Sequence, residues 1–116
     1  MEIKLSQFIG ERCITAEDGK KLLSEIKPKL LAGEIVVIDF TGVKILLSLF
    51  LNNSIAPLYE NFDQNQLNHV LFLKNTSGSQ ENTLTQVKIS AEKYYRNPNQ
   101  KKAVDESMDR FFVEKE

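Results

Sequence analysis

"EIVVIDFTGVKILLSLF" occupies residues 34–50 and is the most strongly patterned part of the sequence. Its first half, up to Asp39, is a run of β-branched apolar residues, which is typical of a strand buried on both faces of a sheet. Thr41 and Gly42 then indicate a turn. The second half leads through apolar residues and Ser48 into a helical pattern. This order predicts a central strand, a turn and a helix.

Strand and helix patterns alternate on both sides of this stretch. The predicted strands are residues 2–6, 34–40 and 69–75, and the predicted helices are residues 15–33, 48–62, 77–95 and 97–113. Pro28 and Pro57 lie inside the first two of these helices and are expected to kink or end them. Ser77 with Gln80 resembles a capping box, and Asn97 is a natural cap for the last helix. Strands that alternate with helices predict an α/β fold of βαβ units with right-handed crossovers.

The composition bounds the class of protein. The chain has 116 residues and a formal net charge of −1, so we expect one domain, residues 1–116, that does not bind nucleic acid through a basic surface. No apolar run approaches the roughly 20 residues that span a bilayer, and no signal peptide is recognisable, so no membrane association is expected. Cys13 is the only cysteine. A chain without disulfides is consistent with the cytoplasm.

Motifs for catalysis or metal binding are missing from the sequence. His69 is the only histidine, and no cysteine or acidic cluster stands at metal-ligand spacing around it. No glycine-rich phosphate loop occurs, and no base, nucleophile and orienting group can be assembled from the residues. We therefore expect a protein that is not an enzyme and that has no cofactor and no metal. Cys13 is interpreted as a buried small apolar residue.

The stretch "VVIDFTGVKILLSLFLNNSIAPLYENF", residues 36–62, resembles the STAS domain. The closer resemblance is to the STAS-like family of unknown function, through Ser48, Phe50 to Asn52, Ile55 and the Leu58–Tyr59 pair. "EKYYRNPNQKK", residues 92–102, is similar to that family's third helix and the turn after it. The resemblance implies a small STAS-like domain, with a mixed, mostly parallel sheet and helices packed mainly on one face. It also implies a bacterial protein that takes part in signalling.

Two interpretations of Ser48 remain open. In the anti-sigma factor antagonists that the chain resembles, a partner kinase phosphorylates the serine at this position and so switches the protein between partners. The alternative is that Ser48 only caps the second helix by accepting a bond from a backbone amide. The antagonists usually have Asp before this serine and Ser-Gly after it, whereas the neighbours here are Leu47 and Leu49. We therefore favour capping.

The other candidate residues are Asp39, Lys44, Asn52, Asn53 and Asn75. Asp39 ends the central strand, where α/β proteins gather binding sites, yet we favour a role in capping the following turn. Two asparagines are mildly unfavourable in a helix, which suggests a contact surface at Asn52 and Asn53, although a solvated face is the simpler interpretation. Lys44 and Asn75 are expected near the same end of the sheet.

The function expected from these observations is a regulatory or adaptor module that binds a protein partner, such as a kinase or ATPase. A homodimer formed through the apolar residues around Ser48 is a further possibility. The first alternative is a small-molecule or nucleotide-binding domain that uses Asp39 and the asparagines. The second, which rests on the resemblance alone, is an accessory protein of a phage or defence locus.

Overall fold

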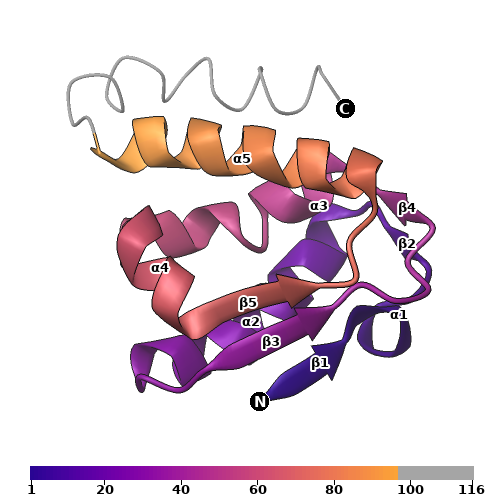
Figure 1. Ribbon diagram of the computed structural model, residues 1–116, viewed down its shortest axis with the longest axis horizontal. Coiled ribbons are helices and arrows are strands. Elements are labelled where there is room, and N and C mark those ends of the chain that lie inside the picture. Colours follow the sequence, from indigo (N-terminus) through magenta and orange to yellow (C-terminus); the bar gives the residue numbers. More distant parts are fainter. Residues whose placement is uncertain (97–116) are drawn as a thin grey trace.

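The computed structural model describes residues 1–96 of the chain (Figure 1). The predicted last helix, with Asn97 as its cap, lies outside the described residues. The elements run in the order β1, α1, β2, α2, β3, β4, α3, the 3₁₀ helix η1, α4, β5 and α5. The α/β class predicted from the alternating patterns is confirmed.

A three-stranded parallel sheet forms the base of the domain. Its strands are β1 (Glu2–Lys4), β3 (Val36–Asp39) and β5 (Leu71–Lys74), in the order β1-β3-β5. The register places Ile38 between Ile3 on one side and Leu73 on the other. The stretch 34–40 therefore supplies the central strand, as its continuous apolar run predicted.

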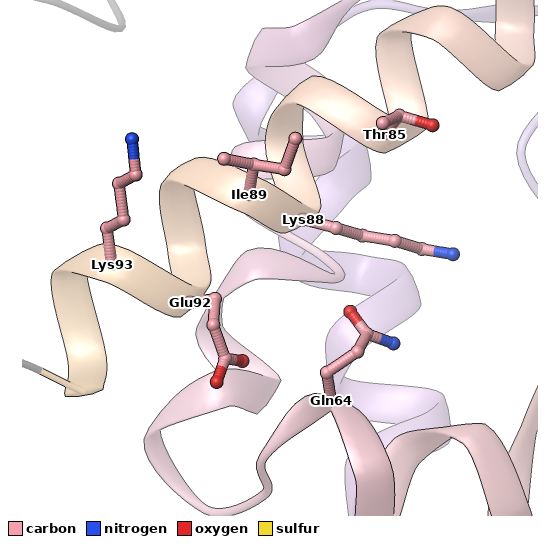
Figure 2. A pocket seen from close by; sticks show the side chains of 6 residues that line it. All are labelled: Gln64, Thr85, Lys88, Ile89, Glu92 and Lys93. Atoms are coloured by element: carbon pink, nitrogen blue, oxygen red, sulfur yellow. The ribbon is translucent and has the colours of Figure 1, made fainter.

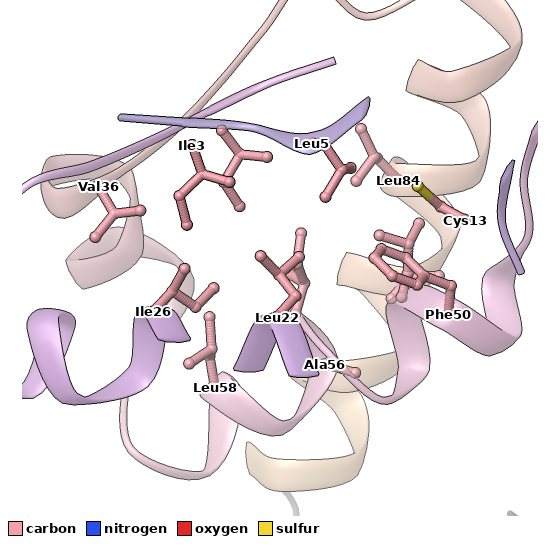
Figure 3. Close-up of a cluster of buried hydrophobic side chains, with 14 of the residues drawn as sticks. Ile3, Leu5, Cys13, Leu22, Ile26, Val36, Phe50, Ala56, Leu58 and Leu84 are labelled. Atoms are coloured by element: carbon pink, nitrogen blue, oxygen red, sulfur yellow. The ribbon is translucent and has the colours of Figure 1, made fainter. Parts of the chain in front are cut away.

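The helices cover mainly one face of this sheet. Ile3 and Ile38 share that face and are almost completely buried, whereas Phe72, which lies on the other face, is 44% exposed. The exposed face also carries an ion pair of 3.1 Å between the Lys74 Nζ and a carboxylate oxygen of Glu2. Figure 3 shows side chains of α2 and of the following segments gathered opposite Ile3. The predicted one-sided packing is confirmed.

The helix α2 (Ala16–Leu31) crosses behind the sheet. Thr15 caps it by accepting from the Asp18 amide at 3.1 Å. Pro28 was predicted to kink or end the helix, and of these two effects the end is wrong, since the helix continues to Leu31. Proline removes its own N–H bond and crowds the carbonyl four residues before it, and the burial of residues on both sides holds the last turn in place. The chain then turns at Gly33, whose φ of 82° favours glycine.

A second, smaller sheet was not predicted. It pairs β2 (Arg12–Cys13) with β4 (Ile45–Leu46) in parallel, two residues each. A short helix α1 (Leu5–Phe8) follows β1 directly and limits that first strand to three residues. Strands of two residues are too short to leave a recognisable alternation in a sequence.

The predicted helix over residues 48–62 is divided in two. It consists of α3 (Ser48–Asn52) and η1 (Ala56–Glu60), and the break precedes Pro57 instead of lying at it. The Ser54 hydroxyl donates to the Phe50 carbonyl at 3.0 Å from inside the core. Side-chain bonds of this kind compete with the helical backbone, and Pro57 cannot supply the donor that would continue an α-helix.

The predicted strand over residues 69–75 begins too early. Residues 69 and 70 belong to α4 (Gln64–Val70), and β5 starts at Leu71. Asp63 and Gln66 form a complete capping box that starts α4. This helix was missed because its capping signal is followed by a polar segment with little apolar periodicity.

The last described element, α5 (Gly78–Arg96), lies across α3 and η1 (Figure 1). The predicted capping box is confirmed: the Ser77 amide donates to the Gln80 side chain at 2.9 Å, and the Gln80 amide donates to the Ser77 hydroxyl at 3.2 Å. Leu84 and Val87 of α5 are buried in the core, which α5 closes on the side opposite the sheet.

Candidate functional site

Five of the six predicted site residues lie in two groups at one end of the molecule. Figure 1 shows that β3 and β5 point toward the side where β2, β4 and the start of α3 are found. One group stands where the parallel strands end, and the other follows β4. In the first group, Asp39 is hydrogen-bonded to Asn75. The second group consists of Ser48, Asn52 and Asn53, at and just after the short helix α3.

Asp39 is the centre of the first group. Its Oδ1 accepts from the backbone amide of Thr41 at 2.9 Å, from the hydroxyl of Thr41 at 2.7 Å and from the Asn75 amide at 2.9 Å. The predicted turn cap is therefore confirmed. These bonds, of which that from Asn75 has the largest effect, lower the pKa of Asp39 from 3.8 to about 2. A carboxylate with so low a pKa is a poor proton acceptor near neutral pH.

Asn75 reaches Asp39 because its backbone turns sharply after β5. Its φ of 61° lies in the left-handed region, which asparagine tolerates better than most residues. The Phe40 amide also donates to the Lys74 carbonyl at 2.9 Å. This group therefore fastens the carboxyl ends of β3 and β5 together.

The Asp39 group makes stability depend on acid pH. Because folding lowers the pKa of Asp39, its contribution is complete above a pH of about 4 and is lost as the pH falls toward about 2. Thermal unfolding of Asp39→Asn is expected to show a lower melting temperature at neutral pH and a flatter dependence on pH across that window. Asn75→Gly, which keeps the left-handed backbone but removes the donor, is expected to flatten the same part of the curve. If the melting temperatures of both variants change with pH in parallel to that of the wild type across this window, the result would contradict this role.

Lys44 does not join the Asp39 group. Its ammonium pairs with a carboxylate oxygen of Glu11 at 3.4 Å, and both side chains are well exposed. The neighbouring Val43 carbonyl accepts from the Gln80 side chain at 3.0 Å. The turn before β4 is therefore held to the start of α5 through Gln80, a residue that the sequence had indicated only as part of a capping box.

Ser48 is the first residue of α3 and not its cap. Leu47 occupies the cap position with an extended backbone, and no side chain caps this helix. The capping interpretation of Ser48 is therefore wrong. The helix begins one residue later than the capping interpretation requires because of the small sheet. The Leu47 amide donates to the Cys13 carbonyl at 3.0 Å, which keeps Leu47 extended, and the helix starts after it.

Two exposed apolar residues precede Ser48. Ile45 is 37% exposed and Leu47 is 39% exposed, and Ser48 itself is partly exposed. We call these three residues the β4–α3 surface. From the sequence, these apolar residues were interpreted as the junction that leads into a buried helix. Their exposure was considered only as the condition under which they would form a dimer contact.

Asn52 and Asn53 do not form a solvated face. The Asn53 amide donates to the Leu49 carbonyl at 2.8 Å. Both polar side-chain atoms of Asn52 are shielded from solvent, and neither has a hydrogen-bond partner among residues 1–96. The simpler interpretation of a solvated face is wrong for Asn52.

Replacing Asn52 is expected to stabilise the protein. A buried polar group without a partner costs roughly 1–3 kcal/mol, and leucine has a similar size and no polar atoms. We expect Asn52→Leu to raise the free energy of unfolding by about 1 kcal/mol in urea titrations. Asn53→Ala, which breaks the bond to Leu49, should lower it. A loss of stability in Asn52→Leu would show that the amide has a role that the fold does not explain.

Groups that could perform chemistry are dispersed in the described part of the chain. Residues 1–96 contain no group of three or more His, Cys, Asp and Glu side chains placed to hold a metal ion. Cys13 is fully buried, as predicted, and burial together with the charge of Asp18 raises the pKa of its thiol to about 12. His69 is exposed on α4, with its Nδ1 at 2.8 Å from the Asn65 carbonyl.

The fold and this site define a small α/β domain whose polar groups serve turns and strand ends. The model of the family described as "STAS-like domain of unknown function (DUF4325)" matches residues 18–81, which is more than half of the chain. The chain belongs to that family, and the predicted resemblance is confirmed. The matched region contains all six candidate residues.

The other comparisons add no relative. A search of curated proteins found no match, and a search of solved structures found none either. None of the helices within residues 1–96 is long and apolar enough to cross a membrane.

Proposed function

We propose that this protein is a regulatory or adaptor module, not an enzyme, and that it binds a protein partner in the cytoplasm through the β4–α3 surface. The observation that carries this proposal is the exposure of Ile45 and Leu47 beside Ser48. Exposed apolar side chains that cluster are typical of interaction sites, because water leaves them on binding. Ile45 and Leu47 precede Ser48, which stands where the STAS resemblance places the phosphorylated serine.

The polar groups of the site support binding over catalysis. The Asp39 carboxylate already accepts three hydrogen bonds on one oxygen, and its low pKa makes it a weak base. The Cys13 thiol is buried and stays protonated near neutral pH, so it is not an activated nucleophile. Unlike catalysis, the binding of a partner requires no activated side chain, only a surface of suitable shape with exposed apolar area, and the β4–α3 surface has such area.

Phosphorylation of Ser48 would regulate this surface. Because Ser48 does not cap α3, its hydroxyl is not committed to the fold in the way that the capping interpretation required. A phosphate adds a charge of roughly −1.5 to −2 at neutral pH and would disfavour burial of the adjacent Leu47 by an apolar partner. The partner would therefore bind the unmodified form.

Ser48 phosphorylation can be tested with a kinase encoded beside the gene. The protein is incubated with that kinase and ATP, and modified sites are located by mass spectrometry. We expect phosphate on Ser48 and none on Ser54, which is fully buried and bonded to the Phe50 carbonyl. An unmodified Ser48, or equal labelling of a Ser48→Ala variant, would remove the switch from the proposal.

A homodimer is the competing use of the same surface. Size-exclusion chromatography with light scattering distinguishes the two uses. A monomeric wild type leaves Leu47 free for another protein. A dimer that Leu47→Lys converts to a monomer would assign the surface to self-association instead.

A further inference from the structure

One face of the parallel sheet carries apolar side chains that residues 1–96 leave partly exposed. Ile35 is 53% exposed, Phe72 is 44% exposed, and Val37, which pairs with Phe72, is half-buried. We call these three residues, which share one side of the strands, the open sheet face. A sheet whose strands all run parallel normally has both faces covered, because its strands are apolar on both sides. Another segment is therefore expected on this face.

The sequence that follows the described residues has the character that such a cover needs. The helix predicted over residues 97–113 carries one apolar stripe, because its large apolar residues recur at helical spacing. The stripe consists of Val104, Met108, Phe111 and Phe112. A helix that is apolar along one stripe has to bury that stripe against another element.

The described chain ends within reach of the open sheet face. Arg96, the last residue of α5, donates to the carbonyls of Tyr59 and Phe62, to the latter at 2.8 Å, just before α4 begins. The helix α4 leads directly into β5 and is about 10 Å long. Figure 1 shows the end of α5 on the same side of the molecule as α4 and the start of β5. Residues 97–103 can extend over about 23 Å, which is enough to bring the stripe to β5.

The charges of the two surfaces are complementary. On the side of the sheet that the open sheet face occupies, Glu2 already has a lysine partner and Asp39 accepts three hydrogen bonds. Lys4 lies on the same side and forms no ion pair within the described residues. Asp105 and Asp109 each follow a residue of the apolar stripe in the sequence, which on a helical pattern puts both on one flank of it. Such complementarity fixes the orientation of a docked segment.

The groove between α4 and α5 is the nearest alternative position for the stripe. Figure 2 shows the side chains that line this groove, and Ile89 is the only large apolar one among them. A stripe of four large apolar residues would therefore cover mostly polar side chains there, which is costly. The open sheet face offers three apolar residues and is the better match.

We propose that the C-terminal segment of this chain, residues 97–116, passes around the end of the sheet and lays its apolar stripe on the open sheet face. The apolar side chains of both surfaces then leave water, which stabilises the domain. The sheet is covered on both faces, and its own C-terminal segment keeps other proteins from binding there. This proposal does not depend on the function proposed for the β4–α3 surface.

The test is a nitroxide spin label on residue 106 of the full chain labelled with ¹⁵N. Glu106→Cys supplies the attachment point opposite the apolar stripe of the predicted helix. Cys13 does not compete for the label, because it is fully buried and its thiol pKa is raised to about 12. A nitroxide broadens the NMR signals of nearby amides. We expect the amide signals of residues 35–37 and 71–73 to be lost, and those of residues 85–89 in α5 to be retained.

Two further substitutions in the labelled chain assign the effect to the stripe. Phe112→Asp places a charge in the stripe and should restore the lost signals. Val113→Asp is the matched control, since Val113 falls on the opposite side of the helical pattern and its replacement should change nothing. Signals lost only in α5, no loss at all, or a loss that also arises when ¹⁵N-labelled chains without nitroxide are mixed with unlabelled spin-labelled chains would overturn the proposal. None of these results bears on the β4–α3 surface, because the two surfaces share no residue.

Discussion

Replacing Phe50 with alanine is expected to lower the free energy of unfolding by about 3–5 kcal/mol, the usual cost of deleting a buried aromatic side chain. Phe50 is fully buried although it lies in the short helix α3, two residues after the partly exposed Ser48. Figure 3 shows its ring within the same buried cluster as Cys13 and Leu84. A helix of five residues has little stability of its own, so α3 depends on this side chain for its position.

The measurement is urea unfolding of Phe50→Ala beside Ile89→Ala. Ile89 is 52% exposed, so its truncation should cost well under about 1 kcal/mol. Similar losses in the two variants would contradict the claim that Phe50 anchors α3. Because the domain has only a modest total stability, Phe50→Ala is also expected to increase the unfolded fraction without denaturant.

Gly19→Ala is expected to cost about 2 kcal/mol through a clash between two helices. A Cβ at Gly19 of α2 would stand 2.4 Å from the Phe50 carbonyl oxygen and 2.8 Å from the Asn53 Cβ. These atoms are backbone or close to it, so they cannot move aside as the end of a long side chain can. Overpacking of this kind typically costs 1–3 kcal/mol, and the better helix propensity of alanine returns only part of it.

Gly78→Ala is the matched control for this clash. Gly78 begins α5, and a Cβ there would meet nothing within 4 Å. Thermal unfolding should therefore show a lower melting temperature for Gly19→Ala and an equal or slightly higher one for Gly78→Ala. Unchanged stability in Gly19→Ala would show that α3 can shift away from α2 without cost.

The sequence predicted the features that follow from local pattern. Three features could be predicted because each depends on neighbouring residues: the central strand up to Asp39, the turn cap on that residue and the capping box at Ser77. Features that depend on distant contacts could not be predicted. The pairing of β2 with β4 fixed Leu47 in an extended form and so moved Ser48 from the cap into the helix.

The same limit applies to the proposed binding surface. Exposure of Ile45 and Leu47 could not be deduced from an apolar run, because such a run is equally typical of a buried junction. The exposure of these two side chains therefore emerges only from the assembled fold.

The central claim is that a protein partner binds the β4–α3 surface, and calorimetric titration of a partner purified from the source organism tests it most directly. Leu47→Lys places a charge on that surface, whereas Leu31→Lys places the same charge on the exposed end of α2, where Leu31 is 56% exposed. We predict that Leu47→Lys weakens the affinity at least about tenfold and that Leu31→Lys leaves it within about twofold of the wild type. Equal affinities for the wild type and Leu47→Lys would contradict the claim.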